Sequence, residues 1–297
     1  FEFTNQLKLA AIFGFDESDL MPFMKNYFNA TNVVFRVTHT LIKKYKVEYV
    51  NPVPDSLSYH LDDDFYIKNK VIYQRKKETL TLSDIFRVFY YRVYHNAGFD
   101  DHLRTKIIEA TENAEENNWS QPDSSVFFRE ILNFSRHVGS TLSIMNELGV
   151  LGAFLPEFGD LNGFMQHGVY HCYTADEHTL ITIRNLEKLA NQNSSYSQLY
   201  NSIKDKEIIN LALLLHDIAK PIDISGHEII GAEMASSIMI RLGYEEEEIN
   251  KVGFLVKNHL MMEQVAFRRN LNDPETLNGF ATKFNSIEEL DLLYLIT

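Results

Sequence analysis

Four histidines and one aspartate in the second half of the chain have types and spacing suited to holding a divalent metal. His178, the adjacent pair His216 and Asp217, His227 and His259 all fall in the 82 residues from 178 to 259. Imidazole nitrogens and carboxylate oxygens are ligands for Mn²⁺, Fe²⁺ and Zn²⁺, and carboxylates for Mg²⁺. A lone histidine on an apolar helix is more often a hydrogen-bonded core residue, and that reading suffices for His178 or His259 alone. The ordered set as a whole favours a metal site.

The adjacent pair His216 and Asp217 carries the strongest part of this argument. It follows the apolar run 211–215, where a carboxylate and an imidazole are costly to bury unless both have partners. Pro221 cannot continue a helix. The pair is therefore predicted at the C-terminal end of a buried helix, facing a cleft.

Helix ends are predicted to position the other histidines as well. The segment 174–177 has the pattern of a capping box, which places His178 in the first turn of a helix. His227 is expected in a loop ahead of a helix rich in small residues. The acidic run 245–248 is typical of a helix start, and His259 lies at the far end of that helix.

In this order, these residues resemble the HD-domain superfamily of metal-dependent phosphohydrolases. The surrounding sequence is similar to one family in particular, the bifunctional PII uridylyltransferase/uridylyl-removing enzymes, over nearly the whole chain. The motifs that carry the resemblance are FREILNFSRHVGSTLSIMNELGVLGAFLPEF (128–158), YHCYTADEHTL (170–180), LLLHDIAK (213–220), GHEIIGAE (226–233), LVKNHLMME (255–263) and FRRNLNDPET (267–276). That family has nucleotidyltransferase, helical, HD and paired ACT domains, and this chain resembles the middle two.

The resemblance implies a set of metal ligands. It makes His178, His216 and Asp217 ligands of a divalent metal, with Mg or Mn as the first expectation and Fe or Zn as alternatives. A further aspartate is expected just after Thr297, where the sequence given stops. We therefore expect the sequence to be a fragment of a longer enzyme.

The resemblance also implies residues that meet the substrate. Asp217 and Lys220 are the expected catalytic residues, with Lys220 steadying phosphate charge. His227 and His259 match positions that bind a second metal or the substrate phosphate. The loop 221–226 departs from the family pattern, because it carries a proline and only one glycine. This departure bears on how the substrate fits rather than on metal binding.

Three further residues are candidates for substrate binding. Arg268 and Arg269 could hold a phosphate, since the guanidinium group suits phosphate geometry. An equally good interpretation is that they are a solvated pair at a helix end. His171 could line the pocket, although its tyrosine neighbours also suit a packed loop.

The implied reaction is hydrolysis of the phosphodiester that links UMP to a tyrosine of the PII signal protein, as part of nitrogen regulation. The expected partners are therefore PII and the uridylyl group. Two alternatives stay open: an HD phosphohydrolase acting on a free or cyclic nucleotide, and a non-catalytic HD docking module. The transferase active site is expected to be absent, since Gly139-Ser140 is not followed by an Asp-x-Asp pair.

The fold is predicted to be mostly α-helical, with two helical domains. Residues 1–160 are expected to form a helical domain with one small β-hairpin, built from 65–67 and 71–73 around a polar turn. Residues 161–297 are expected to form the HD helical bundle. A glycine-containing stretch at 157–168 is the predicted boundary between them.

Composition narrows the possible partners and compartment. The 297 residues carry a formal net charge of −13, which argues against binding to nucleic acid or to an anionic membrane surface. The single cysteine excludes an internal disulfide and favours the cytoplasm. No apolar run is long enough to span a bilayer.

Overall fold

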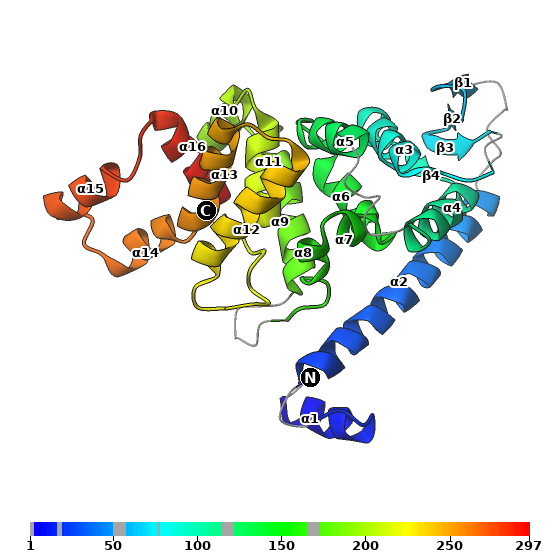
Figure 1. Ribbon diagram of the computed structural model, residues 1–297, viewed down its shortest axis with the longest axis horizontal. Helices are drawn as coiled ribbons and strands as arrows, with labels where there is room; N and C mark the ends of the chain where they lie inside the picture. The colour runs from blue at the N-terminus through cyan, green and yellow to red at the C-terminus, as the bar shows by residue number, and fades with distance from the viewer. Residues whose placement is uncertain (1–2, 17–19, 50–57, 76–77, 115–121, 166–172) are drawn as a thin grey trace.

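The computed structural model describes residues 3–16, 20–49, 58–75, 78–114, 122–165 and 173–297. The described chain is mostly helical, as predicted, with one small sheet in its first half (Figure 1). None of the described helices is both long enough and apolar enough to cross a membrane.

The predicted β-hairpin is present within a larger sheet. Strands β2 (Phe65–Lys68) and β3 (Val71–Gln74) pair antiparallel. The two residues between them have positive φ values, as two-residue hairpin turns require. An antiparallel β1 (Ser58–His60) and a parallel β4 (Gly98–Phe99) extend the sheet to the order β1-β2-β3-β4. These two strands were not predicted, because two or three residues are too few to show an alternating pattern.

Helices of the first half pack against this sheet and against one another. Helix α3 (Leu82–His95) starts from a capping box, in which the Thr81 hydroxyl accepts from the Asp84 backbone N–H and the Asp84 carboxylate accepts from the Thr81 N–H. Helices α5 (Pro122–Leu132) and α6 (Val138–Glu147) make the main contacts toward the second half, against α11 and α9. The other helices are α4 (Asp101–Glu112), α7 (Val150–Phe154) and α8 (Pro156–Gly159).

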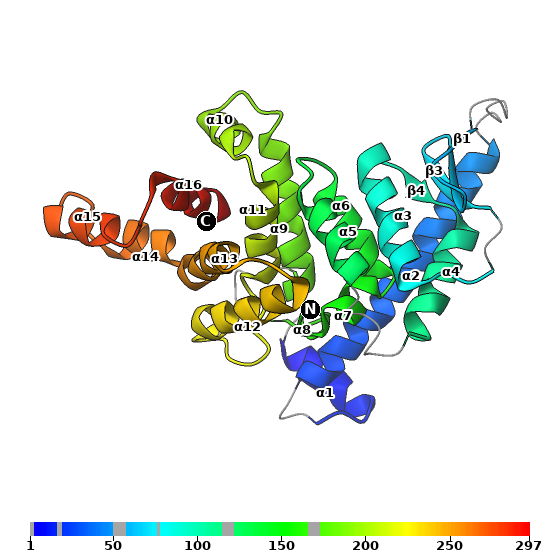
Figure 2. The ribbon, with the colours of Figure 1, turned by 45° about the horizontal axis from the view of Figure 1, so that its top comes forward.

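Helices of the second half surround the buried helix α11 (Lys206–Leu215). Every residue of α11 is buried, in keeping with its nearly continuous apolar sequence. Helices α5, α9 (Ala175–Leu189), α13 (Glu246–Asn258) and α16 (Ile287–Ile296) pack around it. Figure 2 shows α9 and α11 side by side near the middle of the molecule. The other helices are α10 (Ser195–Ser202), α12 (His227–Leu242), α14 (Met261–Arg268) and α15 (Pro274–Ala281).

One continuous core joins the two halves. Its buried apolar side chains run from Phe65 to Leu293 without a break at residue 160. Asn210 of α11 adds a polar link across the predicted boundary, because its Nδ2 donates to the carbonyl of Leu132 in α5 at 2.8 Å. The division into domains at residues 160 and 161 stays a prediction, and the two parts share a core.

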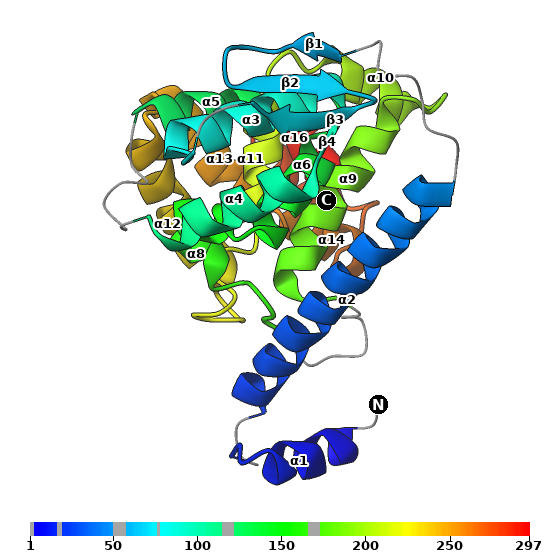
Figure 3. The same cartoon turned by 90° about the vertical axis from the view of Figure 1, so that its right-hand side faces the viewer.

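Helices α1 (Phe3–Ile12) and α2 (Met21–Tyr49) lie apart from that core. They share a small cluster of buried residues around Ala10 and Phe23. Figure 3 shows α2 as a long helix that reaches away from the body, with α1 at its far end. Val34, Phe35 and Leu41 on α2 are more than half exposed.

Candidate metal centre

Asp217 lies at the centre of the predicted cluster. Its side chain is buried, with the residue 1% exposed, and imidazole nitrogens approach both of its oxygens. On Oδ2, His216 Nε2 lies at 3.1 Å and His178 Nε2 at 3.9 Å. On Oδ1, His227 Nε2 lies at 3.3 Å and His259 Nε2 at 3.8 Å. The structure thus brings together all five residues on which the metal prediction was based.

Four helix ends bring these side chains together. His178 lies in the first turn of α9, and His216 and Asp217 follow the last residue of α11. His227 is the first residue of α12, so the prediction that it lies in a loop was wrong by one position. His259 is the C-cap of α13. Backbone groups at helix ends are not all used within the helix, and they remain available to orient these rings.

The predicted capping box at the start of α9 is absent from the described contacts. Thr174 is the N-cap residue, but its side chain accepts no hydrogen bond from the helix. Glu177 instead pairs with Arg184 two helical turns further on, at 2.6 Å from Nη2 to Oε1. The helix start was predicted correctly, and the reason given for it was wrong.

Backbone carbonyls fix the orientation and tautomer of three of the rings. The Nδ1 atoms of His216, His227 and His259 each face the carbonyl three residues earlier, at 2.7, 2.9 and 2.7 Å. A carbonyl can only accept, so each Nδ1 carries the proton, and in the neutral ring each Nε2 presents a lone pair inward. This is the arrangement in which histidine binds a metal through Nε2. These carbonyls were not predicted from the sequence, although their common three-residue offset follows from each histidine closing a helical turn or a tight loop.

The inward-facing atoms form two groups that could each hold a cation. One group is His178, His216 and Asp217, and the other is Asp217, His227 and His259, with the donor atoms of each group within 4.8 Å of one another. His227 Nε2 and His259 Nε2 lie 3.3 Å apart. Two lone pairs this close repel unless a proton or a cation lies between them. Asp217 Oδ2 is buried and accepts no well-directed hydrogen bond from the described residues. These residues therefore fit a divalent metal.

The electrostatics of the cluster favour ionised Asp217 and neutral His259. Burial opposes the Asp217 carboxylate, but His216, His227 and Lys220 outweigh it and hold the pKa of Asp217 well below its usual range. Burial, with His216 nearby, lowers the pKa of His259 to about 4. Burial also opposes the charged form of His227, but hydrogen bonds to Asp217 and to the Ile224 carbonyl outweigh it and raise the pKa of His227.

Lys220 supplies a fixed positive charge at the cluster. Its Nζ lies 2.7 Å from Asp217 Oδ2, and its side chain is 13% exposed. The ammonium group stands one turn after Asp217 in the chain and balances part of the buried carboxylate charge. It is also placed beside any phosphate that reaches the cluster.

Comparison with known proteins agrees with this geometry. The family model described as "HD domain" matches residues 175–285, the stretch that contains the five clustered residues. The chain carries an HD domain. HD domains are metal-dependent, and the His/Asp cluster is where this one could bind its metal.

Similarity to curated proteins extends beyond the HD domain to 99% of the chain. Proteins named "Bifunctional uridylyltransferase/uridylyl-removing enzyme" from Acinetobacter baumannii, Acinetobacter baylyi and Haemophilus influenzae are 28%, 29% and 27% identical to it. The chain spans about a third of the length of these relatives, 35% in each case. An HD domain in a chain with these homologues supports a metal-dependent phosphohydrolase.

The remaining predicted site residues are not part of the described cluster. His171 lies outside the described residues. Arg268 is the last residue of α14 and Arg269 is its C-cap, and both are exposed on the surface of the HD domain. Their role in substrate binding stays a prediction.

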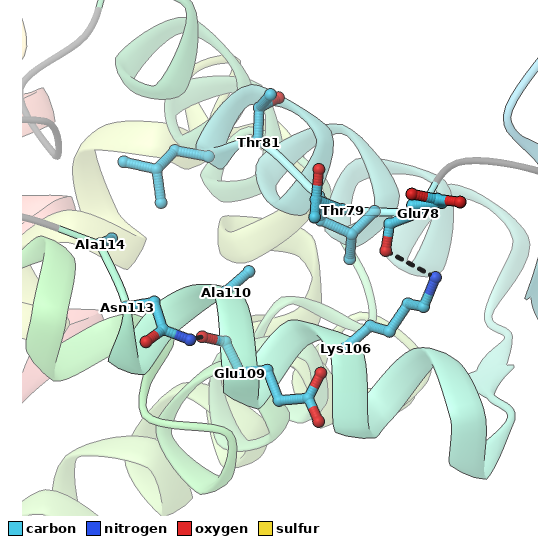
Figure 4. Close-up of a pocket in the computed structure, with 10 residues that line it drawn as sticks. Glu78, Thr79, Thr81, Lys106, Glu109, Ala110, Asn113 and Ala114 are labelled. Carbon is cyan, nitrogen blue, oxygen red and sulfur yellow. Dashed lines mark hydrogen bonds between the residues drawn. The ribbon is translucent and has the colours of Figure 1, made fainter.

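Another cavity lies in the first half of the chain, outside the HD domain. It is bounded by the segment that leads into α3 and by α4 (Figure 4). Lys106 Nζ donates to the carbonyl of Glu78 at 2.8 Å, and Asn113 Nδ2 donates to the carbonyl of Glu109 at 2.7 Å. No histidine is among the described residues that line it, and Lys106 and Asn113 already bond to neighbouring backbone carbonyls. The metal chemistry therefore belongs to the cluster around Asp217.

Proposed function

We propose that the HD domain removes uridylyl groups, by hydrolysing the phosphodiester that links UMP to a tyrosine of the PII signal protein. The observation that carries this proposal is the position of Asp217, whose two oxygens are shared between two cation-binding groups in a chain homologous to uridylyl-removing enzymes. The proposed setting is nitrogen regulation in the cytoplasm.

His178, His216 and Asp217 would hold one divalent cation, and His227 and His259 would complete a second site with Asp217. When bound, such a cation supplies Lewis acidity, which makes water a better nucleophile at neutral pH and withdraws charge from the phosphoryl oxygens. Mg²⁺ or Mn²⁺ is the first expectation, with Fe²⁺ and Zn²⁺ as alternatives.

The protein's own groups would orient the reaction and balance its charge. The carbonyl contacts of His216, His227 and His259 hold the rings before substrate arrives, so little reorganisation is needed. The Lys220 ammonium lies beside Asp217 and would stabilise negative charge that gathers on the phosphoryl oxygens.

Two alternative functions remain, and the experiment described below distinguishes them from the proposed one. The same cluster could hydrolyse a free or cyclic nucleotide, because hydrolysis of any phosphodiester needs the same groups. A docking module would retain the HD fold without using its metal ligands.

The test is release of UMP from uridylylated PII by the purified full-length protein, with Mg²⁺ or Mn²⁺ added. We expect release by the wild type and its loss in His216→Gln, while His102→Gln, an exposed histidine on α4, remains active. Turnover of a cyclic dinucleotide in place of uridylylated PII would support the nucleotide alternative. A wild-type protein that binds no metal and is unaffected by His216→Gln would support the docking module.

A further inference from the structure

Three exposed isoleucines lie within five residues of His227 in the chain, next to a residue of the metal centre. Ile222, Ile224 and Ile229 are 64%, 45% and 53% exposed, and we call them the isoleucine rim. They belong to the segment that includes the unusual loop 221–226, which projects from the body before α12 (Figure 1). Single exposed apolar side chains are ordinary, but a group of them beside a polar centre is typical of an interaction surface.

The rim is tied directly to the metal centre. The Ile224 carbonyl accepts from His227 Nδ1, and the Ile222 N–H donates to the carbonyl of Ala219, two residues after Asp217. Within the loop, Asp223 Oδ1 accepts from the Ser225 N–H at 2.9 Å. These bonds tie the loop to the residues that follow α11 and to His227. The isoleucines therefore flank the backbone that orients His227, a member of the group formed by Asp217, His227 and His259.

The rim continues into a groove between helices α12 and α13. Ile229 lines this groove together with Phe254, Lys257 and Asn258, and Asn258 directly precedes His259. The two helices are joined by a short turn and run antiparallel, so the groove end formed by Ile229 and Lys257 is the end nearest the metal centre. Its lining combines apolar surface with two lysines, Lys257 and Lys283, and one carboxylate, Glu233, so the groove carries a net positive charge in a chain of net charge −13.

We propose that the isoleucine rim and this groove bind the protein strand that carries the phosphodiester, so that Ile222 and Ile229 are specificity-determining residues. The inference rests on the proposed function and adds how the protein part of the substrate is recognised. A nucleoside is bound by convergent polar groups in a concave pocket. The rim instead offers exposed apolar side chains with a nearby cation, which suits a strand with an apolar side chain and an acidic one.

The test compares two substrates with the same phosphodiester, in the presence of Mn²⁺. One is uridylylated PII, and the other is the p-nitrophenyl ester of UMP, which keeps the aryl phosphodiester and lacks the protein. The variant is the double substitution Ile222→Ser and Ile229→Ser. The matched control is Ile240→Ser, since Ile240 is 67% exposed on the same helix and lies about 20 Å along α12 from His227.

We expect the ratio of kcat/KM for uridylylated PII to kcat/KM for the ester to fall about tenfold in the double variant, through KM for the protein. In Ile240→Ser the ratio should equal that of the wild type. An unchanged ratio in the double variant, or cleavage of the ester but not of uridylylated PII by the wild type, would overturn the inference.

Failure of the proposed function gives a different result, in which the wild type cleaves neither substrate. Binding of labelled uridylylated PII to the Mn²⁺-loaded protein then decides the inference separately. Affinity about tenfold weaker in the double variant than in the wild type and Ile240→Ser supports the rim as the binding surface. Equal affinity in all three proteins, or no binding at all, overturns it.

Discussion

At the scale of single residues, the metal centre depends on one carboxylate that serves two groups of histidines. Asp217 is almost fully buried and lies within 4 Å of four imidazole Nε2 atoms and of the Lys220 ammonium. A buried charge of this kind is stable only while its partners remain. Removing the carboxylate charge should therefore affect both cation groups together, whereas removing one histidine should affect one group first.

Asp217→Asn should abolish tight binding of Mn²⁺ at both groups. The amide has nearly the same shape but lacks the negative charge, so we expect the affinity for Mn²⁺ to be at least about 100-fold weaker. Loss of a residue that only supports a metal ligand weakens affinity by about 10- to 100-fold, and loss of a shared ligand should cost at least as much. Isothermal titration calorimetry measures this loss. Glu247→Gln, which removes a carboxylate that is 82% exposed, is the control and should bind as the wild type does. Wild-type affinity in Asp217→Asn would contradict the assignment of Asp217 as the shared ligand.

Lys220→Met should separate metal binding from catalysis. The methionine keeps much of the apolar stem and removes the ammonium that lies 2.7 Å from Asp217 Oδ2. Loss of a positive charge beside the cation sites should leave Mn²⁺ affinity equal or higher. Loss of charge stabilisation at the phosphate should lower kcat for the p-nitrophenyl ester of UMP about 100-fold. Lys251→Met, on the surface of α13, is the control. If metal affinity and kcat fell together, Lys220 would be a structural partner of Asp217 only.

At the scale of elements, the sequence predicted the positions of the helix termini better than the hydrogen bonds that cap them. The acidic run at 245–248 opens α13 through a capping box formed by Glu245 and Glu248, because this signal is local. Thr174 shows the limit of that reasoning, since Glu177 is drawn to Arg184 instead. The contact between α6 and α9 was not predicted at all. It depends on Gly139, whose backbone N–H donates to Glu187 Oε1 at 2.9 Å, 48 residues away in the chain.

Gly139→Ala should destabilise the protein by forcing α6 away from α9. A Cβ at position 139 would lie 2.8 Å from the Arg184 backbone nitrogen and 3.2 Å from its Cα, and backbone atoms cannot move aside cheaply. We expect the free energy of unfolding to fall by about 1–3 kcal/mol, measured by urea denaturation. Gly279→Ala in α15 is the matched control, since a Cβ there meets nothing within 4 Å. That substitution should be neutral or stabilise by up to about 1 kcal/mol. Equal effects of the two substitutions would refute the close packing at Gly139.

At the scale of the whole molecule, the link between the two halves is what the sequence could least predict. The helical class, the hairpin and the five clustered residues follow from local periodicity and motifs. The shared core does not, because its contacts join residues far apart in the chain. Arg129 of α5 is the main polar example, with Nε 2.8 Å from Glu207 and Nη2 3.0 Å from Glu248, over separations of 78 and 119 residues. Its guanidinium also lies 3.9 Å from the centre of the Tyr244 ring.

Arg129→Met should weaken the attachment of α5 to α11 and α13. The change leaves the buried Glu207 without its cation, and we expect the free energy of unfolding to fall by roughly 2–3 kcal/mol near neutral pH. The same substitution in a Glu207→Gln background should cost less, because no unpaired carboxylate remains. Urea denaturation of the four proteins in this cycle gives the coupling between the two side chains.

The loss caused by Arg129→Met should also shrink as the pH is lowered. Burial already raises the pKa of Glu207 against the opposing effect of Tyr244 and Arg129, and removing Arg129 should raise that pKa further. A carboxyl group whose pKa is higher in the folded protein binds more protons there than in the unfolded chain. Its contribution to the free energy of unfolding therefore falls as the pH rises through the window above the unfolded pKa, and it recovers on acidification. The difference between wild type and Arg129→Met should be smaller at about pH 5 than at about pH 7.5. A difference that does not depend on pH would mean that Arg129 acts through its packing on Tyr244 rather than through the charge of Glu207.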